Sequence, residues 1–513
     1  MPLRRSLLAA SGVALLAAAS ASAAQAGLVP DGPGKDRVPA FIGGPAAPHP
    51  IKGRAVPRNP SMAAPGYAAM HADSYASDTY PFLGPLGRHP KVTTEAKANG
   101  LPGLCSTVNY ARSTGLIVAQ CVQAANFTLR LIDPATLKDL ATFTLPPRPS
   151  TVEAVTSGDL DKVLTDTSGG AYYYLDSADR AVLADSAFHV RRFAHERTAS
   201  GWRFRVTDDW DLSKVVPHSC PTWTNPRPKG ECDPVTSVQP DWKGNIWWVT
   251  KHARIGVIDP RTGKVRSVRL KGEAVQNSFA ASEDGVSIVS DHALYLFEAR
   301  AGRPVVLWRR TYDRGTRRKS GQLDQGSGTT PTFLERRYVG ITDNADPRMN
   351  VLVYRVSDGK RICRVPVFDR GHSASDNSLI GFGRSLVVEN NSGYRNFVDL
   401  KPGASSYGGL SRIDVTARGC RTAWTSRERS PSTVAKASVP AGLVYAYTKQ
   451  PREDGIDAWY LTAIDFHTGR TVFKVLTGTG KYFDNNWAPV TLGPDGTAYV
   501  GVVGGLVSVR DTR

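Results

Sequence analysis

The sequence predicts an all-β protein and, more narrowly, a β-propeller built from four-stranded blades. Short runs rich in Val, Ile, Tyr, Thr and Trp recur from about residue 101 onward, with Gly, Asp, Asn and Pro between them. Helical periodicity is nearly absent from this part of the chain. An apolar strand that ends in an acidic residue recurs eight times, mostly at intervals close to the length of a propeller blade.

Individual strands can be assigned from these runs. Clear examples are the segments 245–250, 286–290 and 497–503. The best copies of the repeated strand end are 256–264 and 463–470, where the acidic residue opens an Asp-x-x-Thr-Gly turn. The acidic residues of the eight copies are Asp133, Asp176, Asp259, Glu298, Asp358, Asp414, Asp465 and Asp511.

The spacing of these copies sets the number of blades. Eight copies favour eight blades, and seven blades is the main alternative. The intervals run from 39 residues, between Asp259 and Glu298, to 83 residues, between Asp176 and Asp259. We expect the longest interval to hold an insertion that contains Cys220 and Cys232.

The last blade has only three good strands, all within 487–511. We therefore expect a segment before residue 101, such as 90–96, to supply the fourth strand and close the ring. Closure of this kind removes exposed sheet edges, which would otherwise pair with other chains.

The first residues predict export. Residues 1–26 have arginines at positions 4 and 5, an apolar stretch from 7 to 19, and a small-residue cleavage pattern at 24–26. Both an ordinary signal peptide and a twin-arginine signal fit this pattern. No other apolar run approaches the roughly 20 residues of a membrane helix. We therefore expect no membrane span and a secreted or extracytoplasmic location.

Residues 27–100 are rich in Pro, Ala and Gly, and they predict an irregular N-terminal arm before a propeller domain at 101–513. One part of this arm, 70–81, is unusual because it contains two Tyr, two Asp and a His. Two interpretations fit this segment. It crosses the domain surface and contributes to the functional site, or it packs on the side of the domain.

The cysteines support an oxidising compartment, because they are even in number and form no C-x-x-C pair. We expect pairing between sequence neighbours, namely Cys105 with Cys121, Cys220 with Cys232, and Cys363 with Cys420. The formal net charge of +18 suits either contact with an anionic cell-wall polymer or simple solubility. No nucleic-acid motif accompanies the basic residues, so no nucleic-acid partner is expected.

The Asp-x-x-Thr-Gly turns at Asp259 and Asp465 resemble the blade turn of the quinoprotein alcohol dehydrogenase-like propellers. The tryptophan that follows in that family is replaced here by Ser267 and Phe473. The adjacent cysteine pair of its quinone-dependent dehydrogenases and the haem-binding C-x-x-C-H are both missing. The resemblance therefore implies the propeller fold, and we do not expect pyrroloquinoline quinone (PQQ) as a cofactor.

Polar clusters predict the position of a functional site. In a propeller blade, the loop that leads into the first strand and the loop between the second and third strands lie on the same face. Clusters at 276–278, 324–329, 376–378 and 484–486 fall in leading loops. Clusters at 251–252, 291–292, 343–346, 389–394 and 453–454 fall in the second-to-third loops. Each cluster alone is typical of a turn, but together they predict one polar rim around the channel mouth.

Three sets of residues follow from this rim. The residues that we expect to contact a ligand are Glu273, Gln276, Asn277, Asp324, Asn344, Asp376, Asn377, Asn390, Tyr394, Asn486 and Trp487. The oxygen donors that suit a hard cation such as Ca²⁺ are Glu389, Asn391, Asp484 and Asn485. The residues that suit general base catalysis are His252 and His292, with Asp291, Asp343 or Asp376 beside them.

These features favour an exported propeller that binds an extracellular small molecule, glycan or peptide at its channel mouth, with or without calcium. A metal-assisted hydrolase or lyase that uses the same rim is the first alternative. A cell-wall-associated scaffold that binds polyanions through its basic surface is the second. There is no G-x-S-x-G nucleophile motif, phosphate loop or G-x-G-x-x-G motif.

Overall fold

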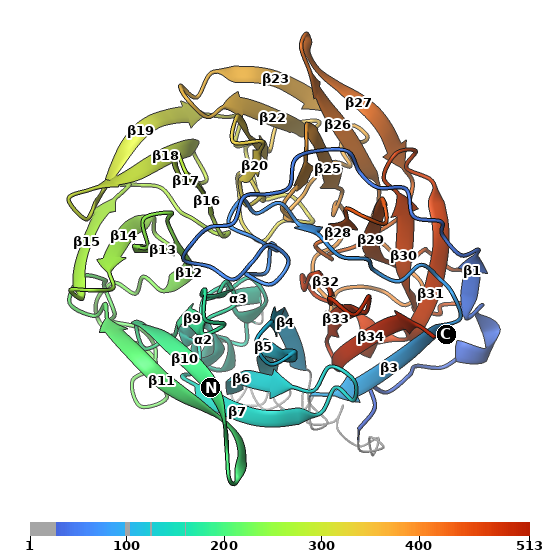
Figure 1. Cartoon of the computed structure of the whole chain (residues 1–513), viewed down its shortest axis with the longest axis horizontal. Coiled ribbons are helices and arrows are strands. Elements are labelled where there is room, and N and C mark those ends of the chain that lie inside the picture. The colour runs from blue at the N-terminus through green and yellow to red at the C-terminus, as the bar shows by residue number, and fades with distance from the viewer. Residues whose placement is uncertain (1–26, 98–102, 124–125, 160, 513) are drawn as a thin grey trace, which may run out of the picture.

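A computed structural model describes residues 27–97, 103–123, 126–159 and 161–512. In this part of the chain, eight sheets stand around a central channel, and each contributes one four-stranded blade (Figure 1). The prediction of an all-β propeller with eight blades is confirmed. The segment 1–26, which predicts an export signal, lies outside the described residues, as does the predicted arm–domain boundary at 100/101.

In seven of the blades the strands pair in chain order from the channel outward, and in all eight each neighbouring pair is antiparallel. The first blade consists of β4 (Gly103–Ala111), β5 (Leu116–Gln123), β6 (Asn126–Ile132) and β7 (Asp139–Leu145). The second consists of β8 (Tyr174–Leu175), β9 (Ala181–Ala184), β10 (His189–Thr198) and β11 (Gly201–Asp211). The third consists of β12 (Val235–Pro240), β13 (Ile246–Thr250), β14 (Arg254–Asp259) and β15 (Lys264–Arg269). The fourth consists of β16 (Ala280–Ser282), β17 (Gly285–Val289), β18 (Ala293–Arg300) and β19 (Arg303–Thr311).

The remaining blades continue the same order around the ring. The fifth consists of β20 (Thr332–Leu334), β21 (Tyr338–Thr342), β22 (Asn350–Arg355) and β23 (Arg361–Pro366). The sixth consists of β24 (Ile380–Phe382), β25 (Ser385–Glu389), β26 (Leu410–Thr416) and β27 (Gly419–Ser426). The seventh consists of β28 (Lys436–Ser438), β29 (Leu443–Thr448), β30 (Ala458–Asp465) and β31 (Thr471–Thr479). The eighth consists of β32 (Val490–Leu492), β33 (Ala498–Val502), β34 (Gly505–Asp511) and the N-terminal β3 (Pro90–Ala96).

The N-terminal strand β3 closes the ring, as the sequence predicts. It pairs antiparallel with β34 over its whole length, from Pro90 opposite Asp511 to Ala96 opposite Gly505. The Asp511 carboxylate strengthens this closure, because it accepts hydrogen bonds from the backbone N–H groups of Leu86, Gly87 and Arg88 at 2.7, 3.1 and 3.0 Å. The N-terminal strand β3 and the C-terminal strand β34 therefore lie side by side in one sheet.

One of the eight acidic positions lies in a different turn from the others. Asp176 follows β8, the innermost strand of the second blade, so it lies in the first-to-second turn, whereas Asp259 ends a third strand. The turn of the second blade between β10 and β11 has no acidic residue next to an apolar strand end. Asp176 still represents the second blade, so the count of eight blades is unaffected.

The extra length near this blade divides between two insertions. One precedes β8 and contains the short helices α2 (Pro149–Ser157) and α3 (Asp161–Leu164). The other follows β11 and contains Cys220 and Cys232, as expected. All three predicted disulfides are present, joining Cys105 to Cys121, Cys220 to Cys232, and Cys363 to Cys420. No helix in the described part of the chain is long and apolar enough to cross a membrane.

The arm packs on the propeller through three short elements besides β3. The 3₁₀ helix η1 (Lys35–Arg37) precedes β1 (Phe41–Gly43), which pairs with β31, and β2 (Thr79–Tyr80) runs parallel to β28. A second 3₁₀ helix, η2 (Lys481–Phe483), leads toward β32. The arm runs across the open centre of the ring in Figure 1. The core lies between the blades, where large side chains such as Trp247, Trp248 and Trp459 are buried.

Candidate functional site

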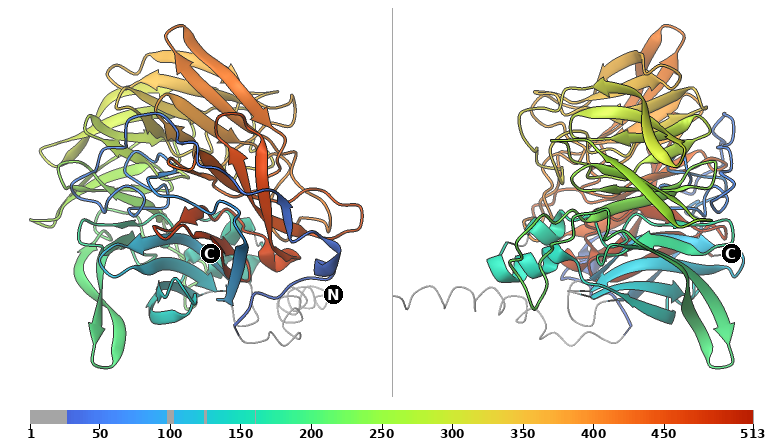
Figure 2. Two further views of the ribbon diagram at one scale, coloured as in Figure 1. Left: turned by 45° about the vertical axis from the view of Figure 1, so that its right-hand side comes forward. Right: turned by 90° about the vertical axis from the view of Figure 1, so that its left-hand side faces the viewer.

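The arm and the polar loops lie on opposite faces of the propeller. The arm runs along the first-to-second turns, where Asn59 donates to the Pro240 carbonyl and the Tyr75 hydroxyl donates to Glu283. The helices α2 and α3 project from the opposite face (Figure 2). That opposite face carries the leading loops and the second-to-third loops with all of the predicted polar clusters. We call its opening the channel mouth, defined by the clusters 276–278, 324–329, 376–378 and 484–486 together with 291–292 and 389–394.

The arm residues 70–80 fill the channel from the other face. The backbone carbonyls of Ser74, Tyr75, Ser77 and Asp78 accept hydrogen bonds from N–H groups on four successive innermost strands, β16, β20, β24 and β28. The segment therefore crosses the domain, as the first of the two interpretations expects, and its contribution to a functional site stays a prediction. Because the arm occupies this end of the channel, a ligand has to approach from the channel mouth.

A buried charge network anchors the arm. The Asp78 carboxylate forms an ion pair with the Lys436 ammonium, and both side chains are fully buried. The same carboxylate contacts His71 Nδ1 at 3.1 Å and accepts a hydrogen bond from the Ser378 hydroxyl. Burial alone would raise the pKa of Asp78, but the Lys436 charge and the contact with His71 outweigh it and lower the pKa. Burial lowers the pKa of Lys436, and the neighbouring Asp78 charge opposes this shift. Lys436 also donates to the Met70 carbonyl at 2.7 Å.

A small cavity lies beside this network. Its volume is about 10 Å³, and His71, Asp73, Tyr172 and Gln239 are among its lining residues. A space of this size holds about one water molecule. Burial raises the pKa of Asp73 to about 7, and its carboxylate accepts a hydrogen bond from the Tyr75 N–H at 2.9 Å.

A second small cavity, also of about 10 Å³, lies at the channel mouth. Its polar lining comes from three blades, and the residues are Gln276, Ser290, Asp291, Asp324, Gln325, Ser327 and Asp376. Three of these residues are carboxylic acids, and Gln276, Asp324 and Asp376 belong to the predicted ligand-contacting set. The structure therefore brings part of that set together around one point.

Asp376 is the most constrained of these carboxyl groups. Only 8% of the residue is exposed, and its Oδ2 accepts a hydrogen bond from the Leu323 N–H at 2.8 Å. Its Oδ1 has no hydrogen-bond partner among the described residues. Burial raises the pKa of Asp376 well above its ordinary value. A buried carboxyl group in this situation either keeps its proton or takes a cation.

The two residues after Asp376 connect the channel mouth to the arm. Asn377 Nδ2 donates to Glu389 Oε2 at 2.9 Å, and Ser378 contacts His71 Nδ1 at 2.9 Å. Burial raises the pKa of Glu389 to about 7, and its Oε1 has no hydrogen-bond partner in the described structure. Asp376 thus faces the mouth cavity, Asn377 contacts the buried Glu389 carboxyl group, and Ser378 contacts the arm.

A second polar group lies between the sixth and eighth blades at the mouth. The Tyr394 hydroxyl donates to Asp484 Oδ1 at 2.8 Å, and the Tyr394 and Trp487 rings meet edge to face with centroids 5.4 Å apart. Asp484 Oδ2 and Trp487 Nε1 are buried without partners among the described residues. Asn486 and Trp487 have φ angles of 37° and 73°, a strained conformation for residues with side chains. Burial raises the pKa of Asp484 to about 6.

The predicted cation ligands each have a hydrogen-bond partner of their own. Glu389 accepts from the Ala435 N–H at 3.1 Å, and Asn391 Oδ1 accepts from the Asp376 N–H at 3.0 Å. Asn485 Oδ1 instead accepts from the Ser432 hydroxyl at 2.6 Å, in a different blade. Each of these side chains is thus held by a separate local partner.

The predicted general bases occupy different positions on the rim. His292 Nδ1 lies 2.8 Å from Asp291 Oδ1, next to the mouth cavity. His252 lies in the third blade, near Glu231 and Asp233. Asp343 is buried, and the N–H and side chain of Asn350 occupy both of its oxygens at 2.7 and 2.8 Å.

The other predicted residues mostly stabilise loops. Glu273 accepts from Tyr295 and Arg309 on the outer part of the fourth blade. Asn344 and Asn390 donate to loop carbonyls, whereas Asn277 Oδ1 accepts a hydrogen bond from the Tyr172 hydroxyl, which belongs to another blade. Sequence reasoning did not single out Lys436 or Ser378 as partners of the arm. The only available signal was the unusual content of 70–81.

A comparison with known sequences gives a partial match. No protein-family model matches the chain. An uncharacterized protein of Archaeoglobus fulgidus is 26% identical over 304 residues, which cover 52% of this chain and 58% of that relative. The chain therefore matches less than two thirds of the length of the curated relative.

Two solved structures are similar to the propeller. The quinohemoprotein alcohol dehydrogenase of Comamonas testosteroni is 11% identical, with a TM-score of 0.51, and the match covers 88% of this chain and 81% of that one. BamB from Moraxella catarrhalis is 16% identical, with a TM-score of 0.38, over 65% of this chain and 93% of its own. The chain has a quinoprotein-like propeller fold. At this level of identity, the likeness concerns the fold and not the activity.

Proposed function

We propose that this chain is an exported binding propeller whose channel mouth holds a hard cation such as calcium and recognises a polar extracellular ligand beside it. Three disulfides and the signal-like residues 1–26 support the extracytoplasmic location. The arm supports the choice of face, because it fills the channel from the opposite side.

The observation that carries the cation proposal is the unpartnered Oδ1 of buried Asp376 beside the mouth cavity. Asp324 and Asp291 line the same cavity, and Ser327 and Gln325 add neutral oxygens. Calcium takes six to eight oxygen ligands at about 2.3–2.6 Å, and it accepts waters where protein ligands are few. A bound cation would hold Asp376 in its ionised form without leaving a buried charge uncompensated.

The neighbouring group around Trp487 supports recognition of a polar ligand. Its buried indole N–H and the free Asp484 oxygen offer a donor and an acceptor on one strained segment. Aromatic faces beside hydrogen-bonding groups suit a glycan or a peptide.

A calcium titration of the mature, chelator-treated protein tests the cation proposal. We expect calcium to raise the melting temperature of the wild type, because a ligand at 100 times its Kd adds about 2.7 kcal/mol of stability. Asp376→Asn should abolish this rise. Asp346→Asn removes an exposed carboxylate in a loop of the same face and should leave the rise intact. A melting temperature of the wild type that changes with neither calcium nor chelator would refute the cation site.

A metal-assisted hydrolase is the second candidate, and one observation favours it. Asp291 lines the mouth cavity and contacts His292 Nδ1 at 2.8 Å. This contact orients the imidazole ring and leaves Nε2 available as a general base. A cation in the same cavity would polarise a substrate carbonyl, which makes its carbon easier to attack.

A further inference from the structure

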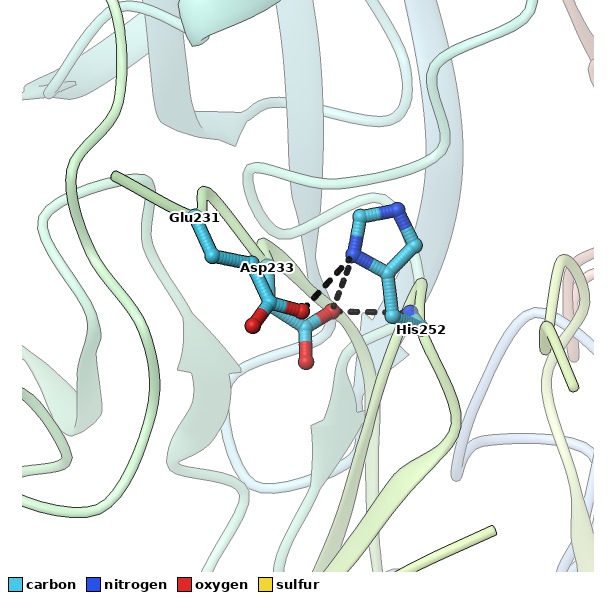
Figure 3. A group of neighbouring side chains, drawn as sticks. All are labelled: Glu231, Asp233 and His252. Atoms are coloured by element: carbon cyan, nitrogen blue, oxygen red, sulfur yellow. Dashed lines mark hydrogen bonds and ion pairs between the residues drawn. The ribbon is translucent and has the colours of Figure 1, made fainter. Parts of the chain in front are cut away.

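A second group of metal-binding side chains lies on the third blade. Glu231, Asp233 and His252 place one ligand atom each within 4.8 Å of one another, and Figure 3 shows the imidazole facing both carboxylates. His252 Nδ1 is 3.6 Å from Asp233 Oδ1 and 3.7 Å from Glu231 Oε1. None of these three residues lines the cavity at the channel mouth.

A disulfide holds the segment that carries Glu231 and Asp233, and hydrogen bonds hold the Asp233 carboxylate. Glu231 and Asp233 flank Cys232, whose disulfide to Cys220 ties this segment back onto its own loop. Asp233 is completely buried, and it accepts hydrogen bonds from the Thr250 hydroxyl and the His252 N–H, each at 2.7 Å. These contacts hold the carboxylate in place in the manner of the outer partners that orient metal ligands.

The distances distinguish this group from an ordinary His–carboxylate hydrogen bond. Contacts of 3.6 and 3.7 Å are too long for such a bond, and His252 Nδ1 is a buried atom without a hydrogen-bond partner among the described residues. Zinc bonds of about 2.0–2.2 Å at tetrahedral angles place neighbouring ligand atoms about 3.3–3.6 Å apart. The two distances from His252 Nδ1 to the carboxylate oxygens are thus close to those between ligands of a common ion.

We propose that Glu231, Asp233 and His252 form a site for a divalent transition metal of the zinc class. His252 Nδ1, Asp233 Oδ1 and Glu231 Oε1 supply three ligands, and a solvent molecule takes the fourth position. An imidazole nitrogen with two carboxylate oxygens suits zinc and its neighbours better than calcium, which prefers oxygen ligands alone. Solvent can reach the site, because the side chains of His252 and Glu231 are 44% and 40% exposed.

Arg269 provides a sensitive internal check. Its guanidinium group binds both oxygens of Glu231, and the Nη1–Oε2 distance is 3.2 Å. This cation competes with a metal ion for Glu231 and repels it. Replacement of Arg269 by a neutral residue should therefore strengthen metal binding, whereas it would weaken a cluster held together only by ion pairs.

Calorimetric titration of the chelator-treated mature protein with ZnCl₂, repeated with Co²⁺ and followed by absorbance, tests this proposal. We expect one zinc per chain, a loss of at least tenfold in affinity in His252→Ala, and tighter binding in Arg269→Gln. His189→Ala is the matched control, because His189 forms a 2.5 Å hydrogen-bonded pair with Asp209 and should not affect zinc binding.

Glu231→Gln provides a second variant at an exposed position, which guards against misfolding of His252→Ala. Asp376→Asn should still bind zinc, which separates this site from the proposed calcium site. Absence of zinc binding in the wild type, or wild-type affinity in both His252→Ala and Glu231→Gln, would overturn the proposal.

Discussion

Replacement of Glu389 by Gln should stabilise the protein at alkaline pH. Glu389 is buried, its Oε2 accepts from Asn377 and Ala435, and its Oε1 has no partner in the described structure. Gln keeps the size of the side chain and one acceptor oxygen for both donors. It cannot ionise, so it avoids the cost of burying a charge.

The magnitude follows from the pKa of Glu389. Burial raises this pKa from 4.5 to about 7, so the folded protein holds the proton more tightly than the unfolded chain. The contribution to stability is complete below about pH 4.5 and is lost as the pH rises through about 7. A difference of about 2.5 pKa units corresponds to about 3 kcal/mol. Wild type and Glu389→Gln should therefore differ little at pH 5, and the variant should be more stable by up to about 3 kcal/mol at pH 8.

Thermal unfolding with chelator present, measured from pH 5 to pH 8, provides the assay. Asp73 and Asp484 also have raised pKa values and remain in the variant, so its melting temperature should still fall with pH, but less steeply. Glu428→Gln is the contrast, because it removes a carboxylate that is paired with Lys474 at 2.7 Å and should destabilise at pH 8. Identical pH dependence in wild type and Glu389→Gln would show that Glu389 does not titrate in this range.

Two further predictions concern the arm and the second candidate function. Asp78→Asn leaves the buried Lys436 ammonium unpaired, so it should lower the free energy of unfolding by about 3–5 kcal/mol and speed proteolysis of the arm. Lys35→Met is the control, because it breaks an exposed ion pair of the arm and should lower the free energy of unfolding by less than about 1 kcal/mol. Equal losses in thermal unfolding would contradict the anchoring role of Asp78. If the mature protein hydrolyses esters or lactones with calcium, His292→Ala should slow turnover by about 10²–10⁴, and an unchanged rate would exclude His292 as the base.

The sequence was most informative where one residue type has one structural use. Asp259 and Asp465 mark strand ends because an Asp-x-x-Thr-Gly turn has to follow a strand. The segment 90–96 could be matched to β34 because a blade with three strands leaves an open edge. Asp176 shows the limit of this reasoning. Its carboxylate also accepts turn N–H groups, so the same chemistry serves a different turn of the blade.

The site was harder to predict because its members are distant in the chain. The polar clusters could be assigned to one face from strand alternation alone, and the leading loops do lie there. Which side chains stay unpartnered depends on three-dimensional contacts: Asn350 bonds to Asp343, whereas Asp376 Oδ1 has no hydrogen-bond partner within the described part of the chain. Glu231 and Asp233 were overlooked because they meet His252 only through the folding of the third blade.

The arm explains why a propeller with this fold would bind its ligand on one face only. Its segment 70–80 bonds to four innermost strands, and the Asp78–Lys436 pair fixes it inside the channel. Ser378 bonds to the arm and Asp376 faces the mouth, so we expect a change at one end of the segment 376–378 to affect the other end. Loosening the arm with Asp78→Asn should therefore weaken calcium binding at Asp376 as well as stability. Calcium affinity that is unchanged in a folded Asp78→Asn variant would mean that the arm only fills the channel and does not shape the mouth.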